Sequence, residues 1–511
     1  MREPVAAHPI GGLAREPGEA PRPSPPALTR WLFPIALVQV AVLLATSTSY
    51  GYHRDELYFI VAGGHPALGY PDQPPLVPLL CWAMNAIAPG SLFLLRTPSA
   101  LAAGATTLLA GLVAREVGGG RDAQLIAAAC TAVSGFSLAV AHLVSTTTFD
   151  MLSTTVFGWL AVRATVRREG APLLLAGLVV GVGCLAKPQV GLVAIAMVGA
   201  VALLGPRSLL RNRWAAAGAL CALGLAAPYI VWQASHGWPQ ATVASNIAGS
   251  QEGGRVGFLP FQLVMVSPVL IGVWIAGLAA PFRQTSLRDL RFIPAGYALL
   301  ALAYIIGNGH AYYLASLYPL LLGLGAPSTA RWLRGHSGRR TALVVAILAS
   351  AAINAVIALP LLPERDLQGS VVMALNPAQG ETVGWPRFVQ TVAGAWRRLP
   401  PAVRRHTALF TANYGEGGAI DLLGARYGLP RAFSGHNGFS EWGIPPSTDT
   451  HAIVTGFETT AELRPYLSHC TTLATVHNGV GLANQEQGLP VRLCRPEGPW
   501  PELWPHLTHF D

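Results

Sequence analysis

Long apolar runs recur along the first 360 residues of this chain, and they restrict its fold more than any other feature. A helix needs about 20 apolar residues to cross the hydrocarbon layer of a bilayer. Only 12% of the 511 residues are charged, about half the share found in soluble domains. We therefore predict a polytopic α-helical membrane protein. The sequence suggests about eleven transmembrane helices, near residues 31–49, 97–114, 123–141, 149–165, 171–186, 188–205, 214–232, 262–281, 292–307, 311–327 and 341–360.

Basic residues are unevenly distributed over the segments between these runs. With the N-terminus inside, nineteen Arg residues fall in inner segments. Only Arg54, Arg96, Lys187 and Arg255 fall on the outer side before residue 361. The positive-inside rule then predicts a multi-pass protein of the plasma membrane with a cytoplasmic N-terminus. Residues 1–30, which are rich in Pro, Gly and Arg, are predicted to be a disordered cytoplasmic tail.

An odd number of spans places residues 361–511 outside the cell, and this region differs in composition from the rest. Short β-rich runs at 407–411, 451–455 and 491–494 alternate with helix-like stretches near 383–399 and 459–468. This pattern predicts an extracytoplasmic α/β domain that follows a transmembrane domain of residues 31–360. Cys470 and Cys494 both lie in it, and they are candidates for a disulfide in an oxidising compartment.

The first outer loop, residues 50–91, carries two adjacent carboxylates directly after the first span. Charged side chains such as Asp55 and Glu56 cost free energy next to a membrane span unless they are solvated or paired. They indicate either a solvated loop with Arg54 as a neighbour, or an acid/base site that takes a proton from a hydroxyl group. Four prolines within residues 71–78 predict a stiff, non-helical surface farther along the loop.

The loop resembles the first extracytoplasmic loop of C-type glycosyltransferases. These include the dolichyl- or polyprenyl-phosphate-mannose protein mannosyltransferases and the aminoarabinose transferases (glycosyltransferase family 39-like). Asp55-Glu56 matches their Asp-Glu motif, and Gln73-Pro74-Pro75-Leu76 matches a His- or Lys-Pro-Pro-Leu motif, with Gln73 as a departure. Further similar strings, typical of bacterial and especially actinobacterial members, are Leu95–Leu101, Phe149-Asp150, Leu185–Pro188, His310–Tyr313, Asn413–Gly418 and Ser434–Asn437.

The resemblance implies transfer of a sugar from a polyprenyl-phosphate carrier to a hydroxyl acceptor at the outer membrane face, with inversion. The implied sugar is mannose, with a pentose as the alternative, and the acceptor is a protein, a polysaccharide or a glycolipid. Asp55 would be the base, while Glu56 and Asp150 would position hydroxyl groups. The residues implied to bind substrate are Tyr70, Asp72, Gln73, Arg96, Lys187, His310, Tyr312 and Tyr313.

Lys187, the only Lys of the chain, is the preferred ligand of the carrier phosphate, because a compact ammonium stabilises charge on a leaving phosphate. A snorkelling anchor is the alternative for Lys187, as is an ordinary interface position for Tyr312 and Tyr313.

Other classes of function are less compatible with the sequence. No Walker or Gly-x-Gly-x-x-Gly string follows a strand, so no nucleotide cofactor is expected. No motif requires a metal, although the carboxylates would allow a divalent ion. The basic residues form short clusters between apolar runs, so the net charge of +9 does not indicate nucleic acid. The remaining alternative is a membrane transporter or lipid-carrier flippase, which would place ionisable residues near the bilayer midplane.

Overall fold

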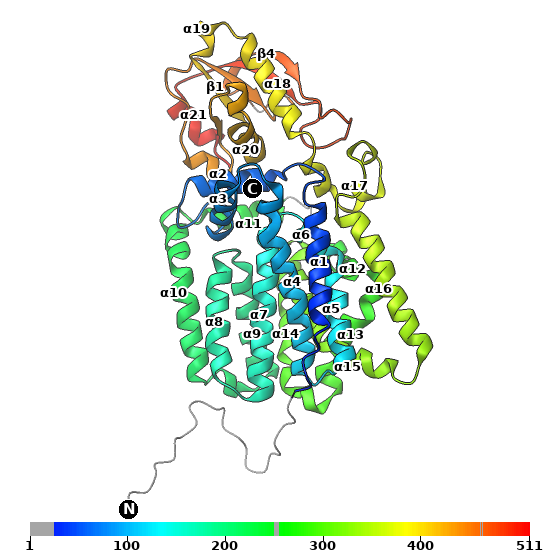
Figure 1. The fold of residues 1–511 in the computed structure, drawn as a ribbon. Coiled ribbons are helices and arrows are strands. Elements are labelled where there is room, and N and C mark those ends of the chain that lie inside the picture. The colour runs from blue at the N-terminus through cyan, green and yellow to red at the C-terminus, as the bar shows by residue number, and fades with distance from the viewer. Residues whose placement is uncertain (1–24, 250–254, 460, 462) are drawn as a thin grey trace, which may run out of the picture.

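The computed structural model describes residues 25–249, 255–459, 461 and 463–511. It consists of a layer of helices that run roughly along one common axis, which we call the helical layer, with a smaller region of sheet and helices at one end (Figure 1). The predicted cytoplasmic tail lies outside the described residues except for residues 25–30. The start of the first helix lies at the end of the helical layer that is opposite to the sheet region (Figure 1).

All eleven apolar runs are helical, as predicted. Some runs divide into two helices, and residues 311–317 form a 3-10 helix before α15. The helices are α1 (Leu32–Thr46), α4 (Leu92–Glu116), α5 (Arg121–Ala132), α6 (Gly135–Ala141), α7 (Thr146–Arg167), α8 (Ala171–Cys184), α9 (Gln189–Leu204), α10 (Arg213–Ser235), α11 (Pro239–Gly249), α12 (Arg255–Met265), α13 (Ile271–Arg283), α14 (Phe292–Ile306), α15 (Tyr318–Leu333) and α16 (Ser337–Ala358).

Fewer helices than eleven are long and apolar enough to cross a membrane as single straight elements. Among the described residues, α4, α10 and α16 meet this condition. The pair α5–α6 is bent by 55°, and the pair α12–α13 by 76°, so each pair is either a broken span or a re-entrant loop. The helices α1, α3 (Leu76–Ile87), α8, α9 and α14 are apolar but shorter. The membrane fold is confirmed, whereas the count of eleven spans stays a prediction.

The segment predicted as the first outer loop contains two helices, α2 (Arg54–Gly64) and α3 (Leu76–Ile87). Both lie between the helical layer and the sheet region (Figure 1). The prolines interrupt helical structure only between α2 and α3. Pro75 is the N-cap of α3 and Pro78 lies in its first turn, where a missing N–H costs little. The Asp55-Glu56 pair is therefore at the N-terminus of a helix and not in an irregular loop.

A five-stranded mixed sheet forms the centre of the C-terminal region. The strands have the order β2-β1-β3-β5-β4, with β1 parallel to both β2 and β3, and β5 antiparallel to both β3 and β4. Three of the strands match the predicted runs. The strands are β1 (Thr407–Thr411), β2 (Ala432–Ser434), β3 (His451–Thr455), β4 (Leu467–Thr475) and β5 (Pro490–Pro496).

Helices cover both faces of this sheet. On β1, Phe410 faces α21, whereas Leu409 faces α18 and α20, as expected from the alternation of side chains along a strand. The helix predicted at 383–399 is α18. The helix predicted at 459–468 was wrong: the described residues there form turns that lead into β4. The helices are α17 (Val371–Leu375), α18 (Trp385–Arg398), α19 (Pro401–Arg404), α20 (Tyr414–Leu423) and α21 (Trp500–Leu507).

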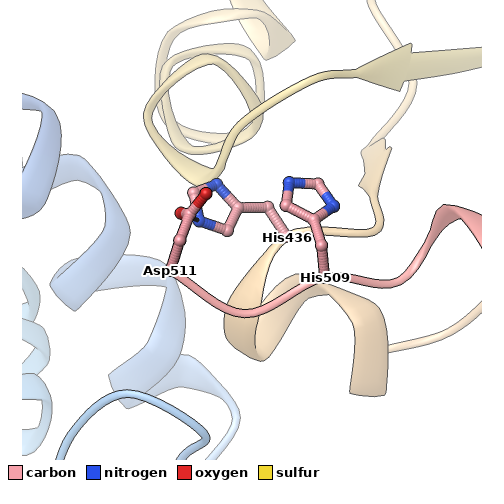
Figure 2. Close-up of side chains that lie close together, drawn as sticks. All are labelled: His436, His509 and Asp511. Carbon is pink, nitrogen blue, oxygen red and sulfur yellow. Dashed lines mark ion pairs between the residues drawn. The ribbon is translucent and has the colours of Figure 1, made fainter. Parts of the chain in front are cut away.

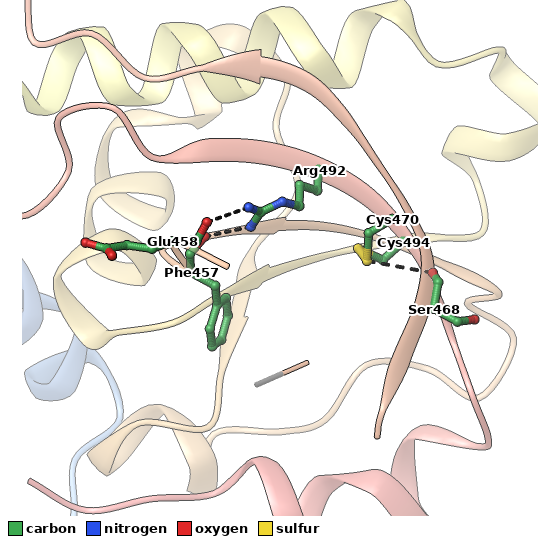
Figure 3. The surroundings of a disulfide bond; sticks show 6 residues. All are labelled: Phe457, Glu458, Ser468, Cys470, Arg492 and Cys494. Carbon is green, nitrogen blue, oxygen red and sulfur yellow. Dashed lines mark hydrogen bonds between the residues drawn. A yellow bond between two sulfur atoms is a disulfide. The ribbon is translucent and has the colours of Figure 1, made fainter. Parts of the chain in front are cut away.

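The disulfide between Cys470 and Cys494 is formed, as predicted. It joins the neighbouring strands β4 and β5 (Figure 3). The register of these strands shifts between Ser468 and Thr471, and His469 adopts a left-handed backbone with φ 48°. This irregularity places Cys470 next to Cys494 across the ladder.

Candidate active site

Asp55 is placed by the way α2 begins. His53 caps the helix by accepting a hydrogen bond from the Asp55 N–H, and Glu56 completes a capping box by accepting from the His53 N–H. The Asp55 side chain is 37% exposed. Its Oδ1 accepts a hydrogen bond of 2.9 Å from the hydroxyl of Tyr414, which lies in the C-terminal region. Asp55 is therefore a partly solvated carboxylate with a fixed orientation.

The helix that carries Tyr414 lies directly against α2. Asn413 and Glu416 form a second capping box, which begins α20 at Tyr414. An added Cβ on Gly418 would lie 2.9 Å from the backbone carbon of Leu57, so only glycine allows the two helices to approach this closely. The string Asn413–Gly418 thus has a physical role: it starts α20, brings it onto α2 and aims Tyr414 at Asp55.

A second carboxylate, Asp72, is held in the same way close by. The Tyr58 hydroxyl donates to Asp72 Oδ1 at 2.7 Å and accepts from the Gly438 N–H at 3.0 Å. The rings of Tyr58 and Tyr414 lie 4.6 Å apart between centroids, so the two tyrosines link the two carboxylates. Burial raises the pKa of Asp72 to about 7, and the Tyr58 hydrogen bond offsets part of this shift. Perturbed carboxyl groups of this kind are typical of functional sites.

Glu56 and Arg96 do not take the substrate-facing positions predicted for them. They form an ion pair in which Glu56 is 0% and Arg96 1% exposed. Arg96 donates to both carboxylate oxygens at 2.8 and 2.7 Å and also to the carbonyls of Ser47 and Gly51. Their hydrogen-bonding groups are used within the protein, and we therefore reassign both as positioning residues.

Tyr70 and Gln73 are also buried. The Tyr70 hydroxyl donates to the Ala62 carbonyl at 2.8 Å and the side chain is 0% exposed, so the predicted substrate contact is replaced by a structural one. The Gln73 amide is 4% exposed, and neither its nitrogen nor its oxygen has a hydrogen-bond partner among the described residues. A buried unpaired amide is costly, so Gln73 remains a candidate for binding a ligand.

The remaining predicted residues form a second cluster around α7 and the break between α8 and α9. Asp150 is fully buried in α7 and accepts a hydrogen bond from Ser316. Lys187, in the break, donates to Thr147 Oγ1 at 2.8 Å, one turn before Asp150. This arrangement brings an acidic and a basic side chain together at the end of the helical layer.

Aromatic rings complete this second cluster. The Lys187 Nζ lies 5.6 Å from the ring centroid of Tyr312 and 5.4 Å from that of Tyr313. His310 stacks on Tyr312, with centroids 5.1 Å apart. Cation–π contacts of this length hold an ammonium without neutralising it. Lys187 is half-buried as a residue, and its bond to Thr147 uses one of the three N–H donors of an ammonium.

Both clusters lie at the same end of the helical layer and are joined by α2 and α3. The Val144 N–H, just before α7, donates to Glu56 Oε1 at 2.9 Å. The Leu76 N–H, at the start of α3, donates to the Leu185 carbonyl in the α8–α9 break at 2.9 Å. The arrangement provides a partly exposed carboxylate, a second carboxyl group with a raised pKa and a basic side chain on one side of the protein.

Four residues of these clusters were not assigned a role from the sequence: Tyr58, Tyr414, Thr147 and Ser316. Tyr414 lies inside the string Asn413–Gly418, which carried part of the resemblance, and Tyr58 lies two residues after the Asp55-Glu56 motif. Among the described residues, only His436, His509 and Asp511 form a group of three side chains suited to a metal (Figure 2). The carboxylates of the two clusters form no such group there.

Comparison with known proteins agrees with this architecture. Residues 72–232 match the family described as dolichyl-phosphate-mannose-protein mannosyltransferase. ArnT from Cupriavidus metallidurans, solved with bound undecaprenyl phosphate, has a similar fold with a TM-score of 0.56 at 15% identity. The similarity covers 92% of this chain and 98% of that one. No curated protein matches the sequence.

Arabinofuranosyltransferase AftD from Mycobacteria is also similar, with a TM-score of 0.51 at 14% identity. The similarity covers 93% of this chain but 40% of AftD. At these identities the structural likeness establishes the fold, and the family match adds the sequence relationship for residues 72–232. The chain thus has the fold of these two glycosyltransferases, and its residues 72–232 are similar in sequence to the mannosyltransferase family.

Proposed function

We propose that this protein transfers a sugar from a polyprenyl-phosphate carrier to a hydroxyl acceptor at the outer face of the plasma membrane. The observation that carries the proposal is Asp55, a partly exposed carboxylate held by Tyr414 at the same end of the helical layer as Lys187. The matched family is named for a dolichyl-phosphate-sugar donor, and ArnT was solved with undecaprenyl phosphate, which supports a carrier of this chemistry.

The reaction is a single displacement with inversion. Asp55 accepts the proton of the acceptor hydroxyl as its oxygen attacks the anomeric carbon. The bond between that carbon and the phosphate oxygen breaks, and the lipid phosphate leaves with the electron pair. Lys187 stabilises the charge on the departing phosphate. We assign the binding of sugar or acceptor hydroxyls to Asp72, Asp150 and Gln73, and the surroundings of the phosphate to His310, Tyr312 and Tyr313.

Mannose is the proposed sugar, because the matched family is named for mannose transfer. A pentose is the alternative, which the similarity to an arabinofuranosyltransferase supports. The proposed acceptor is a protein, a polysaccharide or a glycolipid. We also propose a cytoplasmic N-terminus and an extracytoplasmic C-terminal region, supported by the excess of Arg in the inner segments and by the disulfide in the outer region.

The test is Asp55→Asn in purified full-length protein, assayed for transfer from polyprenyl-phosphate-mannose and from a polyprenyl-phosphate pentose. The variant should lose about 10²–10⁴-fold in turnover while retaining its affinity for the donor. Lys187→Ala should instead weaken donor binding. Asp122→Asn is the matched control, because Asp122 is also the second residue of a helix that begins with Arg, and its side chain is 59% exposed.

Two results would contradict the proposal. One is well-folded Asp55→Asn protein that transfers sugar at nearly the wild-type rate. The other is wild-type protein that moves lipid-linked sugar across liposome membranes without any transfer, which would favour a flippase. The transporter class is not favoured, since the charged side chains of the site gather at one end of the helical layer and not at its midplane.

A further inference from the structure

The last residues of the chain fold back onto the segment that follows β2. The His509 N–H donates to the Gly435 carbonyl at 2.9 Å, and the Asn437 N–H donates to the His509 carbonyl at 3.0 Å. The Asn437 side-chain amide also donates to the Asp511 carbonyl at 3.0 Å. An added Cβ on Gly435 would lie 1.8 Å from the Leu507 carbonyl oxygen, so the close approach requires glycine.

This pairing brings three metal-ligating side chains to one point (Figure 2). One ligand atom each from His436, His509 and Asp511 lies within 4.8 Å of the other two. His436 is 7% exposed, and its Nε2 pairs with Asp511 Oδ1. The His436 Nδ1 is buried and has no hydrogen-bond partner among the described residues, so the ring is unpartnered on one side.

The His509 ring stacks on the His436 ring, with centroids 4.7 Å apart and an interplanar angle of 18°, and it would turn to direct a nitrogen at an ion. Its hydrogen bonding suits a ligand. Its Nδ1 lies 3.1 Å from the Leu507 carbonyl, which accepts a hydrogen bond and so fixes the proton on Nδ1. Nε2 is then the unprotonated nitrogen. Metal-bound histidines usually donate their other ring N–H to a carbonyl or carboxylate in this manner.

We propose that His436, His509 and Asp511 form a binding site for a divalent transition metal, with zinc as the best fit. Two imidazoles and one carboxylate are a common three-residue zinc set, and a water molecule takes the fourth position. Tetrahedral bonds of about 2.0–2.2 Å place ligands about 3.3–3.6 Å apart. His436 Nε2 and Asp511 Oδ1 lie closer than this and would have to move apart, and His509 and Asp511 are exposed, so their side chains can adjust.

The proposed metal site lies next to Tyr414, the residue that orients Asp55. The His436 ring packs on the Tyr414 ring, with centroids 4.7 Å apart, and Tyr414 donates to Asp55. A metal on His436 would fix the ring that supports Tyr414. Its role would be to stabilise this position, which goes beyond the proposed sugar transfer.

The competing explanation is an ion pair between His436 and Asp511 without any metal. Without a metal, His509 only stacks on the His436 ring, whereas the metal site uses its Nε2 as a ligand. His509→Asn is therefore the informative variant, and its exposed position protects the fold. His506→Asn is the matched control, because His506 is exposed in α21 and stacks on Tyr466 outside the group.

The test uses full-length protein in detergent, stripped with a chelator and titrated with zinc against a competing fluorescent chelator. We expect about one zinc ion per wild-type chain and at least about 100-fold weaker binding in His509→Asn and Asp511→Asn, with no change in His506→Asn. Zinc should raise the thermal midpoint of the wild type but not that of His509→Asn. Wild-type protein that binds no zinc, or equal affinity in His509→Asn, would overturn the site. Neither readout depends on sugar transfer, so the two proposals fail separately.

Discussion

Replacing Glu56 by Gln should destabilise the protein severely, although the change is small. Both oxygens of Glu56 are fully used: Oε1 accepts from Arg96 Nε and the Val144 N–H, and Oε2 accepts from Arg96 Nη2 and the His53 N–H. These four bonds, of 2.7 to 2.9 Å, join the start of α2 to α4 and to the segment before α7. A Gln amide would direct N–H groups at two of these donors and leave the Arg96 charge unpaired.

The expected loss is about 3–5 kcal/mol, the usual cost of removing one partner from a buried ion pair. Solvent does not weaken this ion pair, because Glu56 is 0% and Arg96 1% exposed. The double variant Glu56→Gln/Arg96→Met should recover about 1–3 kcal/mol of that loss, since it removes the uncompensated charge. Glu169→Gln is the matched control, because Glu169 pairs with Arg163 at the surface and its side chain is 43% exposed; it should cost less than about 1 kcal/mol.

Unfolding in detergent, followed by tryptophan fluorescence, measures these differences, and sugar transfer is measured per folded molecule. If Glu56 only positions other groups, lost activity should follow lost folded protein, and the double variant should regain part of both. Glu56→Gln protein with wild-type stability and no turnover would refute this reasoning and return Glu56 to a direct role at the substrate.

Three other predictions concern the orientation of the chain and the C-terminal region. Cysteine introduced at exposed Ser447 should react with an impermeant maleimide on intact cells, whereas cysteine at exposed Ser208 should react only after permeabilisation; the reverse pattern would contradict the orientation. Replacing Cys470 and Cys494 by Ala should lower stability by about 3 kcal/mol, because the disulfide closes a loop over a separation of 24 residues; a reducing agent should then have no further effect on the variant. Burial raises the pKa of Glu486 to about 8, so the folded state favours the protonated acid. The protonated acid therefore stabilises the folded state at pH values below the pKa that Glu486 has in the unfolded chain. This contribution to stability is lost, by up to about 1.4 kcal/mol per pH unit, as the pH rises toward 8. Glu486→Gln should flatten thermal stability between about pH 5 and 8, and an unchanged slope would contradict the assignment.

The sequence was sufficient for features that depend on local pattern. Run length and hydropathy located the helices, and short β-branched runs located β1, β3 and β5. The pattern did not distinguish Asp55 from Glu56, because adjacent carboxylates look alike in a sequence. On a helix, neighbouring side chains point about 100° apart, so Asp55 faces solvent and Tyr414 while Glu56 points inward to Arg96. A capping box normally begins with Ser or Thr, and His53 gave no such signal.

The tyrosine contacts could not be predicted because they join segments that are far apart in the chain. Tyr414 and Asp55 are 359 residues apart, and the pairing depends on α20 packing onto α2 at Gly418. This contact also changes the meaning of the predicted boundary at residue 360. The base that we propose belongs to the helical part, but the groups that orient Asp55 and Asp72 include Tyr414 and the Gly438 N–H of the C-terminal region. The hydrophobic core is likewise continuous between α2, α18 and α20. The site therefore requires both parts in contact, because without the C-terminal region Asp55 would lose the hydrogen bond that fixes it and Tyr58 would lose its contact with Gly438.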